Sequence, residues 1–82
     1  MDLASGDERM DAISRGLAVP DDLDCWVVRA DSGTPLAYAV VLAGDSERRV
    51  RAVAAADPAD PAVAEAVVSA REFLIAGVNN CD

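Results

Sequence analysis

Residues 36–43 read Leu36-Ala37-Tyr38-Ala39-Val40-Val41-Leu42-Ala43, and this stretch decides the fold. It is rich in the branched and aromatic residues that favour β-strands. Because successive side chains of a strand alternate, one face carries Leu36, Tyr38, Val40 and Leu42 and the other carries Ala37, Ala39, Val41 and Ala43. Turn-forming residues lie on both sides, at 31–35 and 44–47. The stretch therefore predicts a strand that is bounded by a turn at each end.

Two similar patterns flank this stretch and predict two further strands. Residues 25–30 read Cys25-Trp26-Val27-Val28-Arg29-Ala30. In residues 48–55, Arg49 and Arg51 alternate with Val50 and Ala52. The connections between the three runs are short, which favours antiparallel pairing because a parallel pair needs a long crossover. The middle of the chain is therefore expected to form a three-stranded antiparallel meander.

Helical patterns lie on either side of this meander. Ser5 and Glu8 have the spacing of a capping box, and Met10, Ile13 and Leu17 fall on one face of a helix expected at 5–16. A second helix is expected at 61–76, with Asp60 as its N-cap and Pro61 at its first position. We therefore expect one α+β domain over residues 1–82, in the order αβββα. Both helices would cover one face of the sheet, in a two-layer sandwich.

The charge of the chain is strongly unbalanced, and this bounds its function. The chain has 15 acidic residues, seven arginines, no lysine and no histidine, which gives a net charge of −8. Such a surface repels nucleic acid and anionic membranes and attracts basic protein surfaces. Without histidine the chain cannot form a Ser-His-Asp or Cys-His arrangement, so we expect no enzymatic activity. The composition predicts no bound cofactor and no metal site.

The acids are concentrated at the two helical ends of the chain. Residues 1–24 carry seven acids and two arginines, residues 57–82 carry five acids and one arginine, and the region between them is close to neutral. If both helices cover one sheet face, that face is acidic and the opposite face is nearly neutral. Arg48, Arg49 and Arg51 form the one basic cluster, which we interpret as the charge of a solvated edge strand.

The two cysteines and the first residues of the chain bear on its cellular compartment. The start Met1-Asp2-Leu3-Ala4 is acidic where a secretory signal needs basic residues, and no apolar run has the length of a membrane span. We therefore expect a cytoplasmic protein in which Cys25 and Cys81 are reduced thiols. Cys25, at the head of an apolar strand, is expected to be a small buried side chain.

Five aspartates are the candidates for binding a partner. Asp7 and Asp11 are spaced i, i+4 on one helix, and Asp21, Asp22 and Asp24 follow in a loop. Carboxylates placed where phosphates would sit could occupy the basic, nucleic-acid-binding surface of a host protein complex. The alternative is a small homodimeric interaction domain, in which Trp26 and Tyr38 form the contact. In that case the acidity reflects genome composition or adaptation to salt.

The C-terminal helix adds a resemblance to a group of proteins. Its sequence is Ala64-Glu65-Ala66-Val67-Val68-Ser69-Ala70-Arg71-Glu72-Phe73-Leu74-Ile75-Ala76-Gly77-Val78-Asn79. This run is similar to the tail helix of short phage and prophage accessory proteins, and the resemblance covers about the last quarter of the chain. It implies a small acidic anti-defence protein of the kind represented by anti-CRISPR inhibitors.

Overall fold

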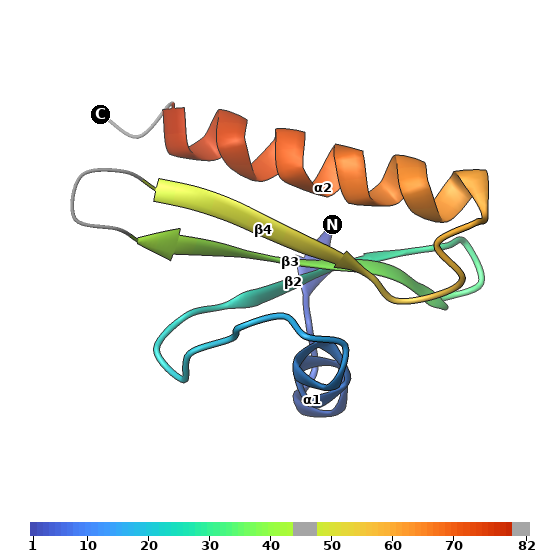
Figure 1. Cartoon of the computed structure of the whole chain (residues 1–82), viewed down its shortest axis with the longest axis horizontal. Helices are drawn as coiled ribbons and strands as arrows, with labels where there is room; N and C mark the ends of the chain where they lie inside the picture. The colour runs from blue at the N-terminus through green and yellow to red at the C-terminus, as the bar shows by residue number, and fades with distance from the viewer. Residues whose placement is uncertain (44–47, 80–82) are drawn as a thin grey trace.

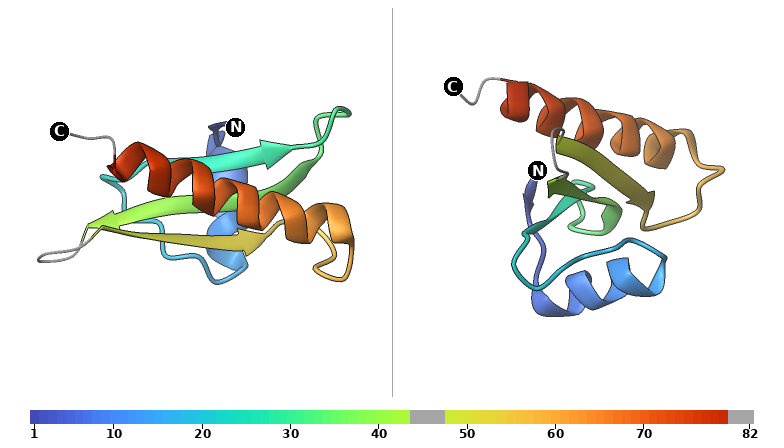
Figure 2. Two further views of the ribbon diagram at one scale, coloured as in Figure 1. Left: turned by 90° about the horizontal axis from the view of Figure 1, so that it is seen from above. Right: turned by 60° about the vertical axis from the view of Figure 1, so that its left-hand side comes forward.

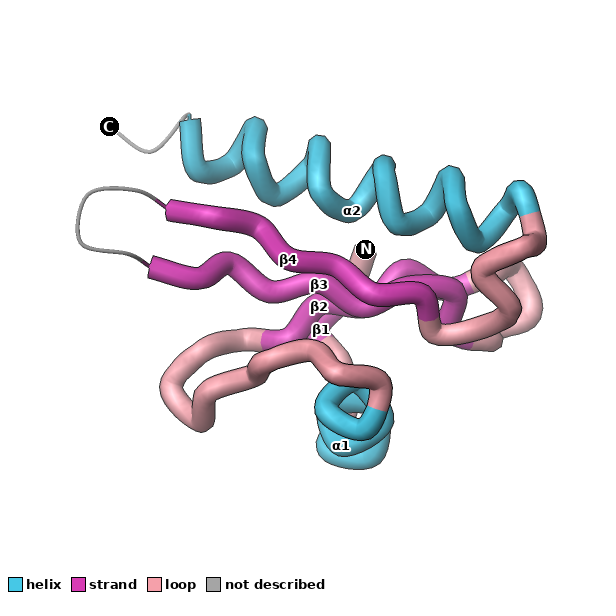
Figure 3. The backbone as a smooth tube through the Cα atoms, viewed as in Figure 1, coloured by secondary structure: helices cyan, strands magenta, loops and turns pink. Residues whose placement is uncertain are grey.

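The computed structural model describes residues 1–43 and 48–79 of the 82-residue chain. The elements, in chain order, are β1 (Asp2–Leu3), α1 (Gly6–Ser14), β2 (Cys25–Arg29), β3 (Pro35–Ala43), β4 (Arg48–Ala54) and α2 (Pro61–Asn79). Figure 1 shows these elements along the chain, and Figure 3 separates helices, strands and loops. The α+β class is confirmed, and the observed order among the described residues is βαβββα.

The sheet is antiparallel throughout, with the strand order β1-β2-β3-β4. The predicted meander of β2, β3 and β4 is confirmed. The prediction of three strands and of the order αβββα is wrong, because Asp2 and Leu3 pair with Val27 and Trp26 and add the short strand β1. A two-residue strand has no alternation long enough to recognise in the sequence. β1 is a strand only because its main chain pairs with the free edge of β2.

The two helices lie on opposite faces of the sheet, so the molecule has three layers (Figures 1 and 2). This corrects the expected two-layer sandwich with both helices on one face. The reason lies in β3, whose two faces are both apolar. Tyr38 and Val40 belong to the core cluster on the α1 side, and Ala39 belongs to the cluster on the α2 side. Each face needs a cover, and each helix supplies one.

Helix α2 packs on its face through small side chains. Ala70 and Leu74 of α2 meet Ala39 of β3, which is completely buried. The helix begins as predicted, because an Asp60 carboxylate oxygen accepts from the Ala62 amide at 2.9 Å and Pro61 is the first helical residue. It extends to Asn79, beyond the predicted end at 76. No helix in the described part of the chain has the length and apolarity needed to cross a membrane.

Helix α1 begins with the predicted capping box. The Ser5 amide donates to Glu8 Oε1 at 2.9 Å, and the Glu8 amide donates to Ser5 Oγ at 3.2 Å. The expected apolar face does not pack as a unit, because Met10 is 66% exposed and Ile13 is also exposed. Ala12 is buried instead, together with Leu17 after the helix. Hydrogen bonds from Arg29 to Glu8 and from Tyr38 to Asp11 are consistent with this orientation of α1.

Candidate functional site

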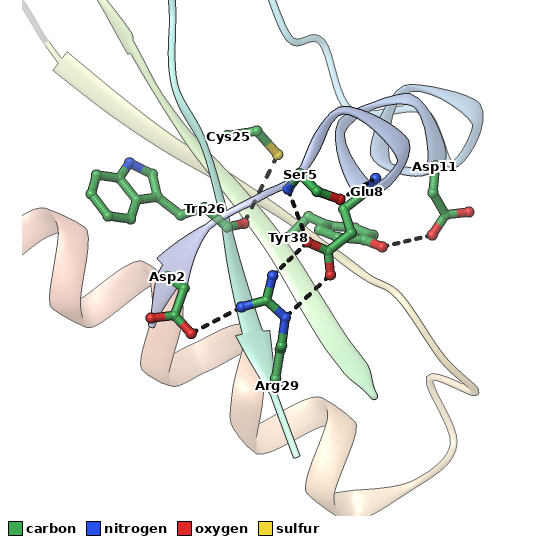
Figure 4. A network of polar contacts seen from close by, with 8 residues as sticks. All are labelled: Asp2, Ser5, Glu8, Asp11, Cys25, Trp26, Arg29 and Tyr38. Carbon is green, nitrogen blue, oxygen red and sulfur yellow. Dashed lines mark hydrogen bonds and ion pairs between the residues drawn. The ribbon is translucent and has the colours of Figure 1, made fainter. Parts of the chain in front are cut away.

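Arg29 joins three elements on the α1 side of the sheet (Figure 4). Its guanidinium donates to both carboxylate oxygens of Glu8, at 2.5 and 3.3 Å, and to Asp2 Oδ2 at 2.9 Å. The side chain of Arg29 thereby ties β2 to α1 and to β1. The hydrogen bond from Arg29, and then the one from the Ser5 amide, lower the pKa of Glu8. These two acids are therefore compensated within the chain.

Asp11 accepts a hydrogen bond from the hydroxyl of the buried Tyr38. The Tyr38 hydroxyl donates to Asp11 Oδ2 at 2.8 Å, and Arg15 Nε donates to the same oxygen at 3.0 Å (Figure 4 shows the tyrosine contact). These two hydrogen bonds lower the pKa of Asp11. Burial, together with the Asp11 carboxylate, raises the pKa of Tyr38 to about 12. Asp11 thus orients α1 on the sheet, although the sequence suggested that it contacts a partner.

The loop between α1 and β2 is fixed by Arg9. Its Nη1 donates to the Leu23 carbonyl at 2.7 Å, and its Nη2 donates to the Pro20 carbonyl. The Leu23 amide also donates to the Pro20 carbonyl, at 3.0 Å, which closes a turn around Asp21 and Asp22. The guanidinium is therefore bonded to main-chain carbonyls and does not bind the side chains of the loop aspartates.

Four of the five predicted aspartates form what we call the acidic face: Asp7, Asp21, Asp22 and Asp24. All four side chains are exposed. None of them makes a hydrogen bond or ion pair with any residue in 1–43 or 48–79. Asp7 lies in the first turn of α1, and the loop is bonded to α1 through Arg9. The acidic face therefore lies on the α1 side of the sheet (Figure 1).

The acidic helical ends do not share one side of the molecule. Because α1 and α2 lie on opposite faces of the sheet, the acids of α1 and those of α2 lie in different outer layers (Figure 2). This corrects the expectation of one acidic and one neutral face. The acids of α2, Glu65 and Glu72, are exposed and lie about two helical turns apart.

Trp26 and Tyr38, the predicted self-association residues, lie on opposite faces of the sheet. Tyr38 is 1% exposed and belongs to the core on the α1 side. Trp26 is half-buried and packs against the cluster under α2. Near it, α2 leaves an apolar groove of about 200 Å³, lined by Met1, Val28, Ser69, Ala70 and Phe73.

One of the two cysteines, Cys25, lies in the described part of the chain. Cys25 is buried as predicted, and burial raises the pKa of its thiol. Cys81 lies outside the described residues, as do Asp45, Glu47 and Asp82. Among residues 1–43 and 48–79, no group of three or more His, Cys, Asp or Glu side chains is placed to hold a metal ion.

The sequence did not predict the roles of two arginines, Arg9 and Arg29, which fix the elements of the site. Their partners are 14 and 21 residues away, and Arg9 bonds to carbonyls, which no residue pattern marks. The sequence offers one indirect indication: because acids outnumber arginines by 15 to seven, an arginine close to acids is expected to form ion pairs within the chain. Comparison of the chain with family models, curated proteins and solved structures gave no match.

Proposed function

We propose that the chain is a non-enzymatic binding protein whose acidic face engages the basic, nucleic-acid-binding surface of a host protein complex. In its most specific form it is a phage-encoded anti-defence inhibitor of the anti-CRISPR type. One observation carries the proposal. Arg9 fixes the loop through the carbonyls of Pro20 and Leu23, and so holds Asp21, Asp22 and Asp24 in place without neutralising them.

The physical advantage of this arrangement is preorganisation. A flexible acidic segment loses conformational entropy when it binds, and that loss subtracts from the affinity. A loop that is already hydrogen-bonded loses less. The exposed carboxylates of a chain of net charge −8 also steer a basic partner during diffusion, most strongly at low ionic strength. At the partner they bind the same arginines and lysines that nucleic acid would bind and displace the anions that accompany these side chains.

The test compares two triple variants of equal charge. Asp21→Asn, Asp22→Asn and Asp24→Asn together remove the loop charges. Asp31→Asn, Glu65→Gln and Glu72→Gln remove three other exposed carboxylates that have no partner among the described residues. Both variants carry a net charge of −5, so a difference between them reports position rather than total charge.

Capture of partners from nuclease-treated host lysate, identified by mass spectrometry, provides the measurement. At about 0.5 kcal/mol for each exposed ion pair, the loop variant should bind the captured protein about tenfold more weakly. The control variant should stay within about twofold. If the loop variant retains the partner as strongly as the unaltered chain does, the proposal fails.

A second candidate function is supported by the apolar groove beside α2. Phe73 is 60% exposed at the groove, and Leu3, the cross-strand neighbour of Trp26, is 55% exposed. A homodimer that buries these side chains would be an interaction domain whose acidity has no role in recognition. Sedimentation at micromolar concentration in high salt distinguishes the two. A salt-resistant dimer that Phe73→Ser dissociates favours this function, and a monomer excludes it.

A further inference from the structure

The outer strand β4 has an open edge. In the described sheet it pairs with β3 alone (Figure 2, left, shows it at the rim). The Ala55 amide donates to the Leu36 carbonyl at 2.9 Å, and this sets the phase of the β3–β4 ladder. Because antiparallel pairs alternate, the N–H and C=O groups of Val50, Ala52 and Ala54 point away from β3. These main-chain groups are available to another strand.

Two arginines flank this edge, one from each side. A hollow of about 260 Å³ beside the strand is bordered by Val50, Arg51 and Ala52 of β4 and by Arg71 of α2. Arg51 is the register partner of Val40, so it lies on the α1 side of the sheet, whereas Arg71 comes from the α2 layer. Both are exposed, and neither makes a hydrogen bond or ion pair with any described residue.

We propose that the β4 edge binds an extended acidic segment of a partner protein, which adds to the sheet as a further strand. The main-chain groups of Val50, Ala52 and Ala54 would bond the segment, as in other cases of strand addition. Successive residues of a strand point to opposite faces, so two adjacent acidic residues direct one carboxylate toward Arg51 and the other toward Arg71. This site lies outside the acidic face and extends the function proposed above.

Charge complementarity selects this occupant over a second copy of the chain. Strand β4 contains three arginines in seven residues. In a two-fold β4–β4 pair centred on Arg51, the two Arg51 side chains would lie opposite one another across the strands, which is unfavourable. An acidic strand replaces that repulsion with attraction. The net charge of −8 opposes binding only weakly, since at physiological ionic strength charges beyond about 8 Å are screened.

The test uses a fluorescein-labelled heptapeptide of sequence Thr-Val-Asp-Glu-Val-Thr-Val. A matched peptide carries Asn-Gln in place of Asp-Glu. Fluorescence anisotropy should show that the acidic peptide binds at least about tenfold more tightly than the amide peptide, as two charge-assisted contacts require. On binding, hydrogen exchange should slow at the amides of Val50, Ala52 and Ala54. The amides of Arg49, Arg51 and Val53 already face β3 and should change little.

Variants of the protein separate the charges from the main chain. Arg51→Gln with Arg71→Gln should weaken the acidic peptide about tenfold and leave the amide peptide unchanged. Arg15→Gln, which removes an arginine from the end of α1, should have an effect of less than about twofold. Ala52→Pro removes an outward N–H, a change that edge strands tolerate, and should weaken both peptides. N-methylation of alternate peptide amides tests the same bonds without altering the protein.

Three results would overturn the inference. The first is equal affinity for the acidic and amide peptides. The second is binding that protects amides elsewhere and leaves those of Val50, Ala52 and Ala54 exchanging at the free rate. The third is a homodimer in sedimentation whose formation protects these same amides, because β4 would then be occupied by a second copy. Removal of the loop carboxylates of the acidic face through Asp21→Asn, Asp22→Asn and Asp24→Asn leaves this site intact, so the two proposals fail independently.

Discussion

Three arginines on the α1 side of the sheet bind two kinds of acceptor: Arg15 and Arg29 bind carboxylates, and Arg9 binds main-chain carbonyls. Arg29 neutralises Glu8 and Asp2, Arg15 neutralises Asp11, and Arg9 contacts main-chain carbonyls. Because so few cations are present, this distribution decides which carboxylates stay free. The acids that pair are Asp2, Glu8 and Asp11, which position β1 and α1. The four aspartates of the acidic face have no ion-pair partner among residues 1–43 and 48–79.

The Tyr38–Asp11 hydrogen bond predicts a specific response to alkaline pH. Burial and Asp11 raise the pKa of Tyr38 from 10 to about 12, so the fold favours the neutral phenol. Its contribution to stability is complete below pH 10 and is lost as the pH rises toward 12, by about 2 kcal/mol. Tyr38→Phe should lose about 1 kcal/mol at neutral pH and should not show the additional alkaline loss.

The measurement is direct because Tyr38 is the one tyrosine of the chain. Absorbance of tyrosinate at 295 nm therefore reports this side chain alone. The native protein should show almost no tyrosinate at pH 11, whereas the urea-unfolded protein should be largely ionised there. If Tyr38 of the native protein ionised with a midpoint near pH 10, its hydroxyl would not be buried and hydrogen-bonded to Asp11.

At the scale of elements, the loop between α1 and β2 is the part whose order the proposed function needs. Arg9→Gln removes the bonds to Pro20 and Leu23 and makes the chain one unit more negative. If total charge governed binding, this variant would bind a basic partner more tightly. Because preorganisation governs it, we expect about fivefold weaker binding, equivalent to about 1 kcal/mol of ordering.

Two readouts check this expectation. Hydrogen exchange at the Leu23 amide, which bonds to Pro20, should become faster in Arg9→Gln. Arg15→Gln is the control with the same change of charge, and it should leave both the exchange of Leu23 and the affinity almost unchanged. Tighter binding by Arg9→Gln would refute the role given to this loop.

The close packing of α2 on the sheet leads to a prediction about stability, because small alanine side chains lie at the contact. Ala39 is completely buried and Ala70 is 1% exposed in the same cluster. Ala39→Leu should overpack this layer and destabilise the protein by about 1–3 kcal/mol. Ala76→Leu, on the exposed side of the same helix, is the matched control and should change stability by less than about 0.5 kcal/mol. Urea unfolding curves of both variants provide the comparison.

At the scale of the whole molecule, local signals predicted local structure well. The alternation at 36–43, the capping residues Ser5 and Glu8, and the Asp60–Pro61 start were all confirmed. The strand β1 and the placement of the helices on opposite faces were not foreseen. Both depend on contacts between distant segments, such as Asp2 with Val27, which leave no pattern along the chain.

The candidate site was predictable to a similar extent. Four of the five predicted aspartates are exposed and have no partner among the described residues, whereas Asp11 accepts hydrogen bonds from Tyr38 and Arg15. Alternation along β2 and β3 could have placed Trp26 and Tyr38 on opposite faces, because Val27 pairs with Tyr38. The clamp by Arg9 could not be foreseen, since its acceptors are backbone carbonyls that become neighbours only in the folded chain.

The most direct test of the acidic-face proposal is competition with nucleic acid for the captured partner. A labelled oligonucleotide bound to that partner is titrated with the unaltered chain and with the two triple variants, across a series of salt concentrations. We predict that the chain displaces the oligonucleotide, that its affinity falls steeply with salt, and that Asp21→Asn, Asp22→Asn and Asp24→Asn abolish most of the competition while the control variant retains it. Binding of the chain and the oligonucleotide together, without competition at any salt concentration, would contradict the account.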